Sequence, residues 1–329
     1  MLPNHCSHAC PCIDWQRSRR RSKLHASLTL LALVLLAAPP AARAQVRPQV
    51  AGPPPIPPVA SELKVMTWNI RGGQSHACRP IFSPTYLFGI AKEIRSHAGL
   101  DVVALQEVYR GQVALLKPML FPLLGSNPDI HFVATLSCDR DRPGDDFGVA
   151  IISRYHFLEG SKTGVRLCTT PFCPRDEPRV LAGGIIRVNG HRIHIYDTHL
   201  PPGGSAHSRM AELIIRQVDN DGPDRAVLLG DFYMDDESAA YRVIKRKFRD
   251  AWLGAHHSDK DCDSEGYTNK TMHPTQRDDY VFVTDGFRVD GARVTCRFEL
   301  LEAFGLTKTS PNVELRVPDH LPVTVHLVF

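Results

Sequence analysis

The stretch Ala226-Val-Leu-Leu-Gly-Asp231-Phe-Tyr-Met decides how the rest of the chain is interpreted. Its four apolar residues are too few for a helix and are typical of a buried strand. Gly230 ends this run, and the carboxylate of Asp231 follows at once. A carboxylate at the mouth of a buried strand is costly unless it binds a metal, a proton or a hydrogen-bond donor. Gly-Asp is also a common turn after a strand, so the argument for a site needs further residues.

Other apolar runs end in the same way. The runs 65–70, 101–107 and 193–199 end at or near polar side chains, and the runs 279–283 and 321–328 begin beside acidic ones. The polar residues at these six strand ends are Asn69, Glu107, His199, Asp231, Asp279 and the pair Asp319-His320. We expect these strand ends to share one site.

The chain opens with the pattern of a secretory signal peptide. Basic residues between Arg17 and Lys23 precede an apolar run at 28–38, and Ala42-Arg43-Ala44 then gives a small-x-small cleavage pattern. The apolar run is short for a transmembrane helix, and an uncleaved membrane anchor is the alternative. We expect residues 1–44 to be removed and the protein to be secreted or periplasmic.

Removal of this leader would change the charge of the protein. The count of Lys and Arg would fall from 39 to 33 and that of Asp and Glu from 35 to 34, so the net charge would move from +4 to −1. The basic balance of the whole chain therefore belongs to the leader. It gives no argument for nucleic-acid binding, which would need local basic groups or bridging cations.

Proline usage separates the leader from the body of the chain. Residues 45–61 contain six prolines and predict an extended linker. Residues 62–329 show no second proline-rich seam and are enough for one α/β domain. We expect this domain to act as a monomer.

Hydrophobic periodicity predicts helices interleaved with antiparallel hairpins. The Asn189-Gly190 pair between two apolar runs is a strong hairpin signal, because both turn residues need a positive φ. Helices are expected at 86–97, 111–120, 206–218 and 239–247, and strands at 63–70, 101–106, 132–136, 148–153, 181–188, 192–198, 226–229, 280–283, 289–297 and 322–329. This order favours sheets covered by outer helices.

Six cysteines remain after the leader, an even number that suggests disulfides in an exported protein. Cys168 and Cys173 are close enough in sequence to close a small loop, and we expect them to be paired. The other four allow three pairings, of which chain order suggests Cys78 with Cys138 and Cys262 with Cys296.

The polar residues at the strand ends fit metal-assisted hydrolysis. Glu107, Asp231, Asp319 and Asn69 offer oxygen ligands, which suit Mg²⁺, Mn²⁺ or Ca²⁺ better than zinc. Together with histidines that can transfer protons, such a set fits attack of water on a phosphoester. The chain has no Gly-x-Ser-x-Gly elbow and no glycine-rich phosphate loop, which argues against a serine hydrolase or a nucleotide-binding enzyme.

Histidines and arginines complete this candidate site. His199 and His320 are candidate proton-transfer groups because the ordinary pKa of histidine is close to neutral. An acid such as Asp279 would fix the tautomer of a histidine and raise its basicity. Arg179 and Arg209 could each bind a phosphate through the planar fork of the guanidinium.

Six short motifs resemble those of the endonuclease/exonuclease/phosphatase superfamily, in that family's order. They are Thr67-Trp-Asn69-Ile, Gln106-Glu107-Val, Thr198-His199-Leu, Gly230-Asp231-Phe, Arg277-Asp-Asp279-Tyr and Asp319-His320-Leu-Pro. The resemblance covers nearly all of residues 62–329. It implies a four-layer α/β/β/α sandwich, with two mixed β-sheets packed face to face, outer helices, and the site at one edge of the strands.

The resemblance also implies roles for these residues. Glu107 would bind the metal with Asn69 close by, and Asp319 would be a second metal contact. Asp231 would position or deprotonate the attacking water. In addition, Asp279 would orient His320 as a base or phosphate ligand, and His199 would be a phosphate ligand or the acid for the leaving group.

Three departures from the family pattern bear on the substrate. Tyr233 stands where the family has an asparagine near the scissile phosphate, and a phenol reaches farther and donates one hydrogen. Asp278 replaces an apolar residue, which leaves Asp278 as a competitor of Asp279. Tyr109 occupies the position of an arginine that pancreatic-type deoxyribonucleases use in the minor groove, which weakens the case for duplex DNA.

Three functions remain open from the sequence. The first is a secreted metal-dependent nuclease, which the tail 298–307 and the small cysteine loop favour because both are similar to pancreatic-type deoxyribonucleases. The second is a phospholipase of the sphingomyelinase type or a small-substrate phosphatase, which an exposed apolar loop near the site would favour. The third, motivated by Tyr233, is a binding module that has lost catalysis.

Overall fold

In the computed structural model the described residues are 60–74, 79–81, 83–136, 146–168, 173, 177–203, 205–255 and 266–329. All of them lie within one compact unit, Pro57–Phe329. The predicted leader, and the predicted linker as far as Val59, lie outside the described residues. No helix among the described residues is both long and apolar enough to cross a membrane.

Two six-stranded sheets form the centre of this unit. The first sheet has the order β13 (Arg288–Val294), β14 (Val323–Val328), β1 (Glu62–Asn69), β4 (Val102–Tyr109), β6 (Phe147–Ser153) and β5 (Asp129–Leu136). The second has the order β11 (Arg249–Asp250), β12 (Asp279–Val283), β10 (Ala226–Asp231), β9 (His191–His199), β8 (Val180–Val188) and β7 (Thr163–Arg166). Both are mixed, because β1 is parallel to β4 and β9 is parallel to β10 while the other pairs are antiparallel.

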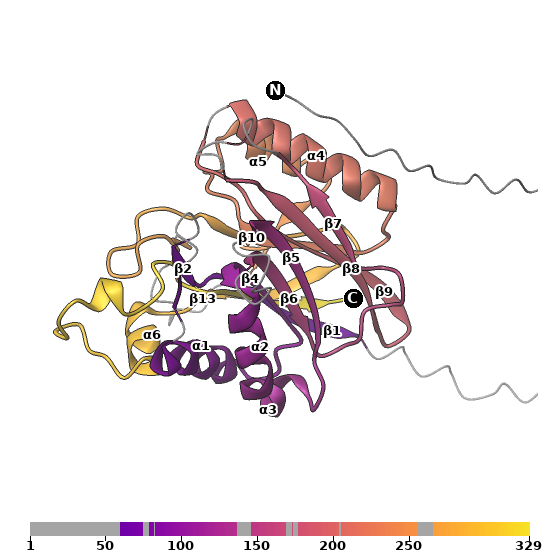
Figure 1. Ribbon diagram of the computed structural model, residues 1–329. Helices are drawn as coiled ribbons and strands as arrows, with labels where there is room; N and C mark the ends of the chain where they lie inside the picture. Colours follow the sequence, from indigo (N-terminus) through magenta and orange to yellow (C-terminus); the bar gives the residue numbers. More distant parts are fainter. Residues whose placement is uncertain are drawn as a thin grey trace, which may run out of the picture. The chain divides into compact units, whose positions relative to one another are not determined.

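Helices cover the outer face of each sheet, as Figure 1 shows. The helices α4 (Ser205–Asp221) and α5 (Ala239–Ile244) lie on the second sheet, at the top of the figure. Below the first sheet lie α1 (Pro84–Ser96), α2 (Arg110–Met119), α3 (Phe121–Leu124) and α6 (Arg297–Ala303). The small strands β2 (Gly73–Gln74) and β3 (Arg79–Pro80) and the 3₁₀ turn η3 (Val313–Leu315) complete the elements. The four-layer α/β/β/α sandwich is therefore confirmed.

The core between the two sheets holds them face to face. It includes Val65 and Ile151 of the first sheet and Ile195 and Leu229 of the second, all fully buried. Burying apolar surface contributes about 25 cal/mol per Å², so this core stabilises the packing of the two sheets. A second core lies between the second sheet and helices α4 and α5.

Most predicted elements are confirmed, and the differences have local causes. The Asn189-Gly190 turn has the expected positive φ values of 48° and 87°. The strand β10 does not stop at Leu229, as predicted, but runs through Gly230 to Asp231. The strand predicted at 289–297 was wrong at its end: β13 stops at Val294, and α6 begins at Arg297. Its start is stabilised because the Glu299 carboxylate accepts the backbone N–H of Cys296 at 3.3 Å.

Candidate active site

The strand register brings the predicted strand ends together at one edge of the sandwich. Asp231 at the end of β10 is paired with His199 at the end of β9 and with Asp279 at the start of β12. In the other sheet, Asn69 at the end of β1 is paired with Gln106, which precedes Glu107. Parallel strands place their carboxyl ends at the same edge, and the two sheets face each other, so these side chains meet.

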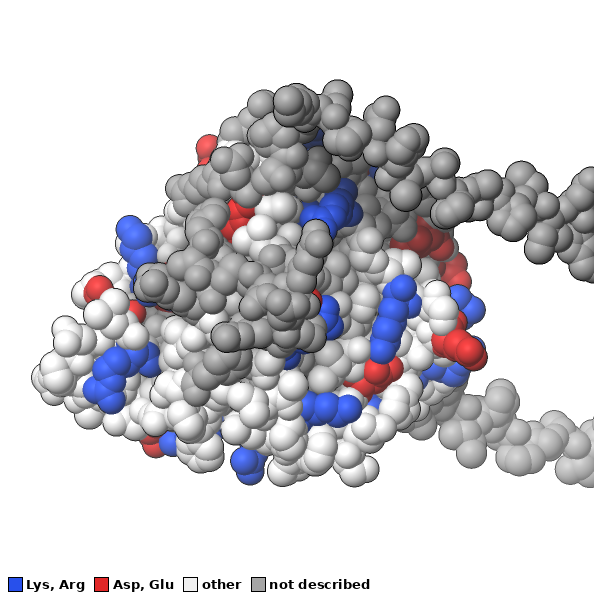
Figure 2. Space-filling model, in the orientation of Figure 1, with Lys and Arg blue, Asp and Glu red and all other residues white. Residues whose placement is uncertain are grey.

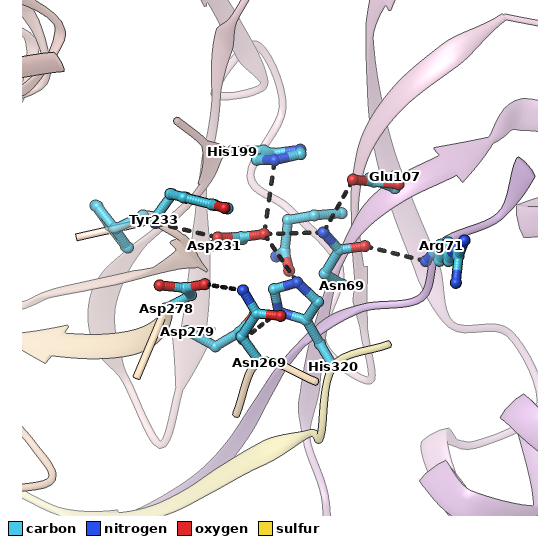
Figure 3. A network of polar contacts seen from close by, with 12 residues as sticks. Asn69, Arg71, Glu107, His199, Asp231, Tyr233, Asn269, Asp278, Asp279 and His320 are labelled. Carbon is cyan, nitrogen blue, oxygen red and sulfur yellow. Dashed lines mark hydrogen bonds and ion pairs between the residues drawn. The ribbon is translucent and has the colours of Figure 1, made fainter. Parts of the chain in front are cut away.

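Asp231 lies at the centre of the resulting polar network (Figure 3). Its Oδ2 accepts a hydrogen bond from Asn69 Nδ2 at 2.8 Å. The same oxygen lies 3.6 Å from His199 Nε2 and 3.7 Å from His320 Nε2. Its Oδ1 accepts the backbone N–H of Tyr233 at 3.1 Å. Three segments distant in sequence, at Asn69, His199 and His320, thus converge on one buried carboxylate.

Asp279 holds His320 in a fixed orientation. His320 Nδ1 lies 2.7 Å from Asp279 Oδ2, and both side chains are buried. The competing Asp278 is engaged elsewhere, because it accepts Asn269 Nδ2 at 2.5 Å and Gln276 Nε2 at 2.7 Å. The ambiguity between the two acids is therefore resolved in favour of Asp279 as the partner of His320.

For both His320 and Asp231, burial and the charge of the partner shift the pKa in opposite directions. Burial would lower the pKa of His320, but the carboxylates of Asp279 and Asp231 raise it well above its usual range. Burial also raises the pKa of Asp231 well above that of an exposed aspartate, while His320 opposes this shift. A carboxylate with a raised pKa is a better proton acceptor, and perturbed groups of this kind cluster at active sites.

His199 and Arg179 form the next side of the site. Burial and the charges of Arg179 and His320 lower the pKa of His199 well below 6.5, so its imidazole is neutral. Arg179 is 4% exposed and donates from Nη2 to Glu177 at 3.2 Å. Its Nε is buried and has no hydrogen-bond partner among the described residues. A buried guanidinium with a free N–H needs an acceptor, which a phosphate oxygen can supply.

Glu107 and Asn69 bring oxygen atoms to the site from the first sheet. Asn69 Nδ2 donates to Glu107 at 3.2 Å, and Asn69 Oδ1 accepts the backbone N–H of Arg71 at 3.0 Å. Burial raises the pKa of Glu107, and the nearby carboxylate of Asp319 raises it further. Asp319 itself lies 3.6 Å from Arg71 Nε and is half exposed.

The backbone is strained at three residues of the site. Arg71, Glu107 and Tyr233 have φ values of 45°, 51° and 44°, a region that residues other than glycine rarely adopt. Glu107 sits where the register of β4 and β6 shifts between Leu105 and Val108. Such a bulge re-aims a side chain, which here is the carboxylate of Glu107.

The remaining predicted residues divide into two cases. The Tyr233 phenol extends toward the space between His199 and Asp231 in Figure 3, so it belongs to the site. Arg209 is exposed on α4, and no contact among the described residues links it to this network. Of the two candidate arginines, Arg179 therefore belongs to the site and Arg209 does not.

Several residues of the site were not singled out from the sequence. Arg71, Glu177, Asn269 and Gln276 hold the predicted residues in place through the bonds described above. Arg71 lies two residues after Asn69 and Glu177 two residues before Arg179, so proximity to a candidate was a usable signal for these two. Asn269 and Gln276 lie in a loop whose sequence shows no comparable pattern.

Asp231, Asp279 and His320 also form a group that could hold a metal ion. Ligand atoms of Asp231, Asp279 and His320 all lie within 4.8 Å of one another. Glu107, Asn69 and Asp319, the ligands that the family resemblance implies, lie beside this group. The arrangement can therefore place a divalent cation, a water molecule and a phosphate within reach of the same side chains.

The small cysteine loop lies just before Glu177 and Arg179. Cys168 and Cys173 form the predicted disulfide. Cys296 is also disulfide-bonded. Cys78, Cys138 and Cys262 lie outside the described residues, so the predicted pairing among these four stays a prediction.

Comparison with known proteins agrees with the fold. Residues 66–299 match the endonuclease/exonuclease/phosphatase family. A member of this family from Bacteroides thetaiotaomicron is similar in structure, with 19% identity, a TM-score of 0.63, and coverage of 82% of this chain and 99% of that chain. No curated protein sequence matches the chain significantly.

Two further solved structures have the same fold. The mannosyl-6-phosphatase of Bacteroides thetaiotaomicron is 21% identical, with a TM-score of 0.61, covering 81% of this chain and 100% of that chain. Truncated TDP2 from Caenorhabditis elegans is 17% identical, with a TM-score of 0.55, covering 82% and 98%. These identities are low, so the likeness shows the fold. The match over residues 66–299 shows that the chain belongs to the endonuclease/exonuclease/phosphatase family of hydrolytic phosphoesterases.

Proposed function

We propose that the protein is a divalent-metal-dependent phosphodiester hydrolase that is exported and acts as a nuclease. One observation carries the proposal: a buried carboxylate oxygen, Asp231 Oδ2, faces both His199 Nε2 and His320 Nε2 at less than 4 Å. The adjoining buried Arg179 guanidinium has an N–H without a partner among the described residues. Proton transfer and phosphate binding can therefore occur at one place.

The donors present fit a hard divalent cation. Glu107, Asn69 and Asp319 supply oxygen atoms, and burial, followed by the repulsion of Asp319, raises the pKa of Glu107. A cation between them would offset both this repulsion and the burial of Glu107. Mg²⁺ fits such a site, with Mn²⁺ or Ca²⁺ as alternatives, because few protein ligands are needed when water and substrate oxygens complete the shell. When bound, the ion would neutralise negative charge on the phosphate.

Asp231 is the candidate acceptor for the proton of the attacking water. Asn69 fixes its Oδ2, and the Tyr233 backbone fixes its Oδ1, so the carboxylate cannot turn away. Burial raises its pKa, which makes the ionised carboxylate a stronger proton acceptor.

The charged His320 is held by Asp279 and can stabilise the phosphate as negative charge develops on it. Its Nδ1 is bonded to Asp279, so Nε2 is the atom left to face the substrate. A preorganised donor of this kind is worth more in a buried site than in water. Arg179 would bind another phosphate oxygen, and the neutral His199 would donate to or accept from the reacting group.

Nucleic acid is the proposed substrate because the tail 298–307 and the cysteine loop are similar to pancreatic-type deoxyribonucleases. On the face shown in Figure 2, described Lys and Arg residues are interspersed with Asp and Glu. Contacts with a polyanion would therefore depend on the site, with its Arg71, Arg179 and metal, more than on a broad basic surface. The disulfide Cys168–Cys173 supports export, since disulfides persist in oxidising compartments.

The test uses one purified protein and several substrates. Plasmid DNA, RNA, sphingomyelin, mannose 6-phosphate and bis(p-nitrophenyl) phosphate are each incubated with Mg²⁺, Mn²⁺ or Ca²⁺. We expect cleavage of nucleic acid and of the model diester, abolished by chelator and by Asp231→Ala. Asp236→Ala, at an exposed acid nearby, is the matched control and should keep full activity. Turnover of the lipid or the sugar phosphate alone would overturn the nuclease proposal, and no turnover of any ester would favour the binding module.

A further inference from the structure

A cavity of about 300 Å³ adjoins the proposed catalytic centre and has no role in the chemistry described so far. Its walls include the apolar side chains of Met272, Val317 and Pro318, and Arg71 and Asp319 also line it. Arg71 donates its backbone N–H to Asn69, and Asp319 precedes His320. The cavity is therefore adjacent to the site of reaction, because Arg71 and Asp319 belong to its lining.

Hydrogen bonds between two loops hold this cavity in shape. The backbone N–H of Thr271 donates to the carbonyl oxygen of Asp319 at 3.0 Å, and Thr271 Oγ1 donates to that of Pro318 at 2.7 Å. Arg297 donates to the carbonyl oxygen of Met272 at 2.7 Å. Because its walls are fixed in this way, the cavity is preformed, and the free-energy cost of ordering it on ligand binding is small.

We propose that this cavity is a nucleoside subsite, which binds the sugar and base on one side of the scissile phosphodiester. The inference rests on the proposed function, because it specifies the group that the same site would bind on one side of the scissile ester. An apolar wall that includes a methionine suits the flat face of a base, since the thioether makes favourable contacts with aromatic rings.

The charges at the mouth and the size of the cavity support the same ligand. Lys270 and Glu314 lie at its mouth and are exposed, so they offer a donor and an acceptor to the polar edge of a base. The volume is at the lower limit of small-ligand sites, which suits one nucleoside and not the paired long chains of a phospholipid. The Arg71 guanidinium lines the cavity, where its Nε lies 3.6 Å from Asp319 and its Nη1 donates to the carbonyl oxygen of Glu314 at 3.3 Å.

Binding, rather than turnover, provides the test, so that its failure is distinguishable from failure of the hydrolase proposal. Calorimetry compares thymidine 5′-monophosphate and thymidine 3′-monophosphate with ribose 5-phosphate, which has no base, in the presence of Mg²⁺. We expect at least one thymidine nucleotide to bind about tenfold more tightly than ribose 5-phosphate, the factor that about 1.4 kcal/mol produces. Equal affinities in the wild-type protein would overturn the subsite, whatever the hydrolysis assays show.

Variants locate the effect in the cavity. Met272→Glu places a charge in the apolar wall and should reduce the preference for the nucleotide to within about twofold, while Met272→Leu should keep it. Leu315→Glu adds the same charge at an exposed residue near the cavity that does not line it, and should leave the preference unchanged. Melting temperatures verify that each variant is folded. A nucleotide preference that survives Met272→Glu in a folded protein would place the base elsewhere and refute the proposal.

Discussion

The imidazole of His320 is bonded through Nδ1 to the carboxylate of Asp279 at 2.7 Å, while the neighbouring Asp278 bonds two side-chain amides instead. Two consecutive acids thus have different partners. The strand pleat explains the difference, because successive side chains of an extended chain point to opposite sides.

The first prediction separates these two acids by their effect on catalysis. Asp279→Asn should lower kcat by about 10²- to 10⁴-fold with little change in KM, because the amide no longer stabilises charged His320. Asp278→Asn is the matched control and should lower kcat by less than about tenfold, as it does not contact the histidine. Steady-state kinetics on bis(p-nitrophenyl) phosphate measures both, and equal losses in the two variants would contradict the assignment.

A second prediction concerns Arg179 and Arg209, the two arginines that the sequence analysis gave as candidate phosphate ligands. Arg179→Lys should lower kcat/KM by about 10²-fold, because a lysine cannot reproduce the planar fork on a phosphate. Arg209→Lys, on an exposed face of α4, should leave kcat/KM unchanged.

NMR titration measures the effect of the Arg179 charge on the site. The Arg179 charge lowers the pKa of His199, so the variant Arg179→Met should raise that pKa. An unchanged titration of His199 in this variant would show that the Arg179 charge does not act on His199.

The third prediction concerns stability and pH. Burial raises the pKa of Asp278 from 3.8 to about 6, while its bonds from Asn269 and Gln276 oppose the shift. A raised carboxyl pKa means that the stability contribution of this group is complete below pH 3.8 and is lost as the pH rises through about 6.

Asp278→Asn removes this titration. The free energy of unfolding of the variant minus that of the wild type should therefore rise by about 2–3 kcal/mol between pH 4 and pH 7. Urea unfolding in the presence of chelator, at a series of pH values, measures the difference. A difference that does not vary with pH would show that Asp278 titrates normally.

The fourth prediction concerns the glycine before Asp231. Gly230 has a φ of 155°, and a Cβ there would lie 2.2 Å from the carbonyl oxygen of Thr198. Gly230→Ala should push β10 and β9 apart and lower the free energy of unfolding by about 2–4 kcal/mol. Gly291→Ala is the control, since nothing lies within 4 Å of a Cβ at that position. Similar melting temperatures for the two variants would contradict the close contact.

Much of the sandwich could be predicted because its strands are strongly patterned. Buried strands such as β1 and β10 are continuous apolar runs, and the β8–β9 turn carries the Asn-Gly pair that requires positive φ. The edge strand β7 was missed, because its exposed side chains carry little apolar signal. The helix α6 was missed because only Thr295 and Cys296 separate it from β13, with no glycine or proline to mark the boundary, and the Glu299 cap is the local signal of its start.

For the site, the sequence predicted which residues lie at strand ends but not which pairs bond. Strand ends follow from the apolar pattern, so the positions of Asn69, His199 and Asp231 at strand ends could be predicted. The bulge that turns Glu107, and the loop that brings Asn269 to Asp278, depend on tertiary contacts. No local pattern in the sequence encodes these contacts.

The most direct measurement is a crystal structure with Mn²⁺ and a non-hydrolysable phosphorothioate dinucleotide, with the metal located by anomalous scattering. The account predicts one Mn²⁺ bound by Glu107, with the phosphorus atom between Arg179, His199 and His320 and with Asp231 facing it. Metal and phosphorus bound away from Asp231, or no bound metal at concentrations that saturate activity, would contradict it.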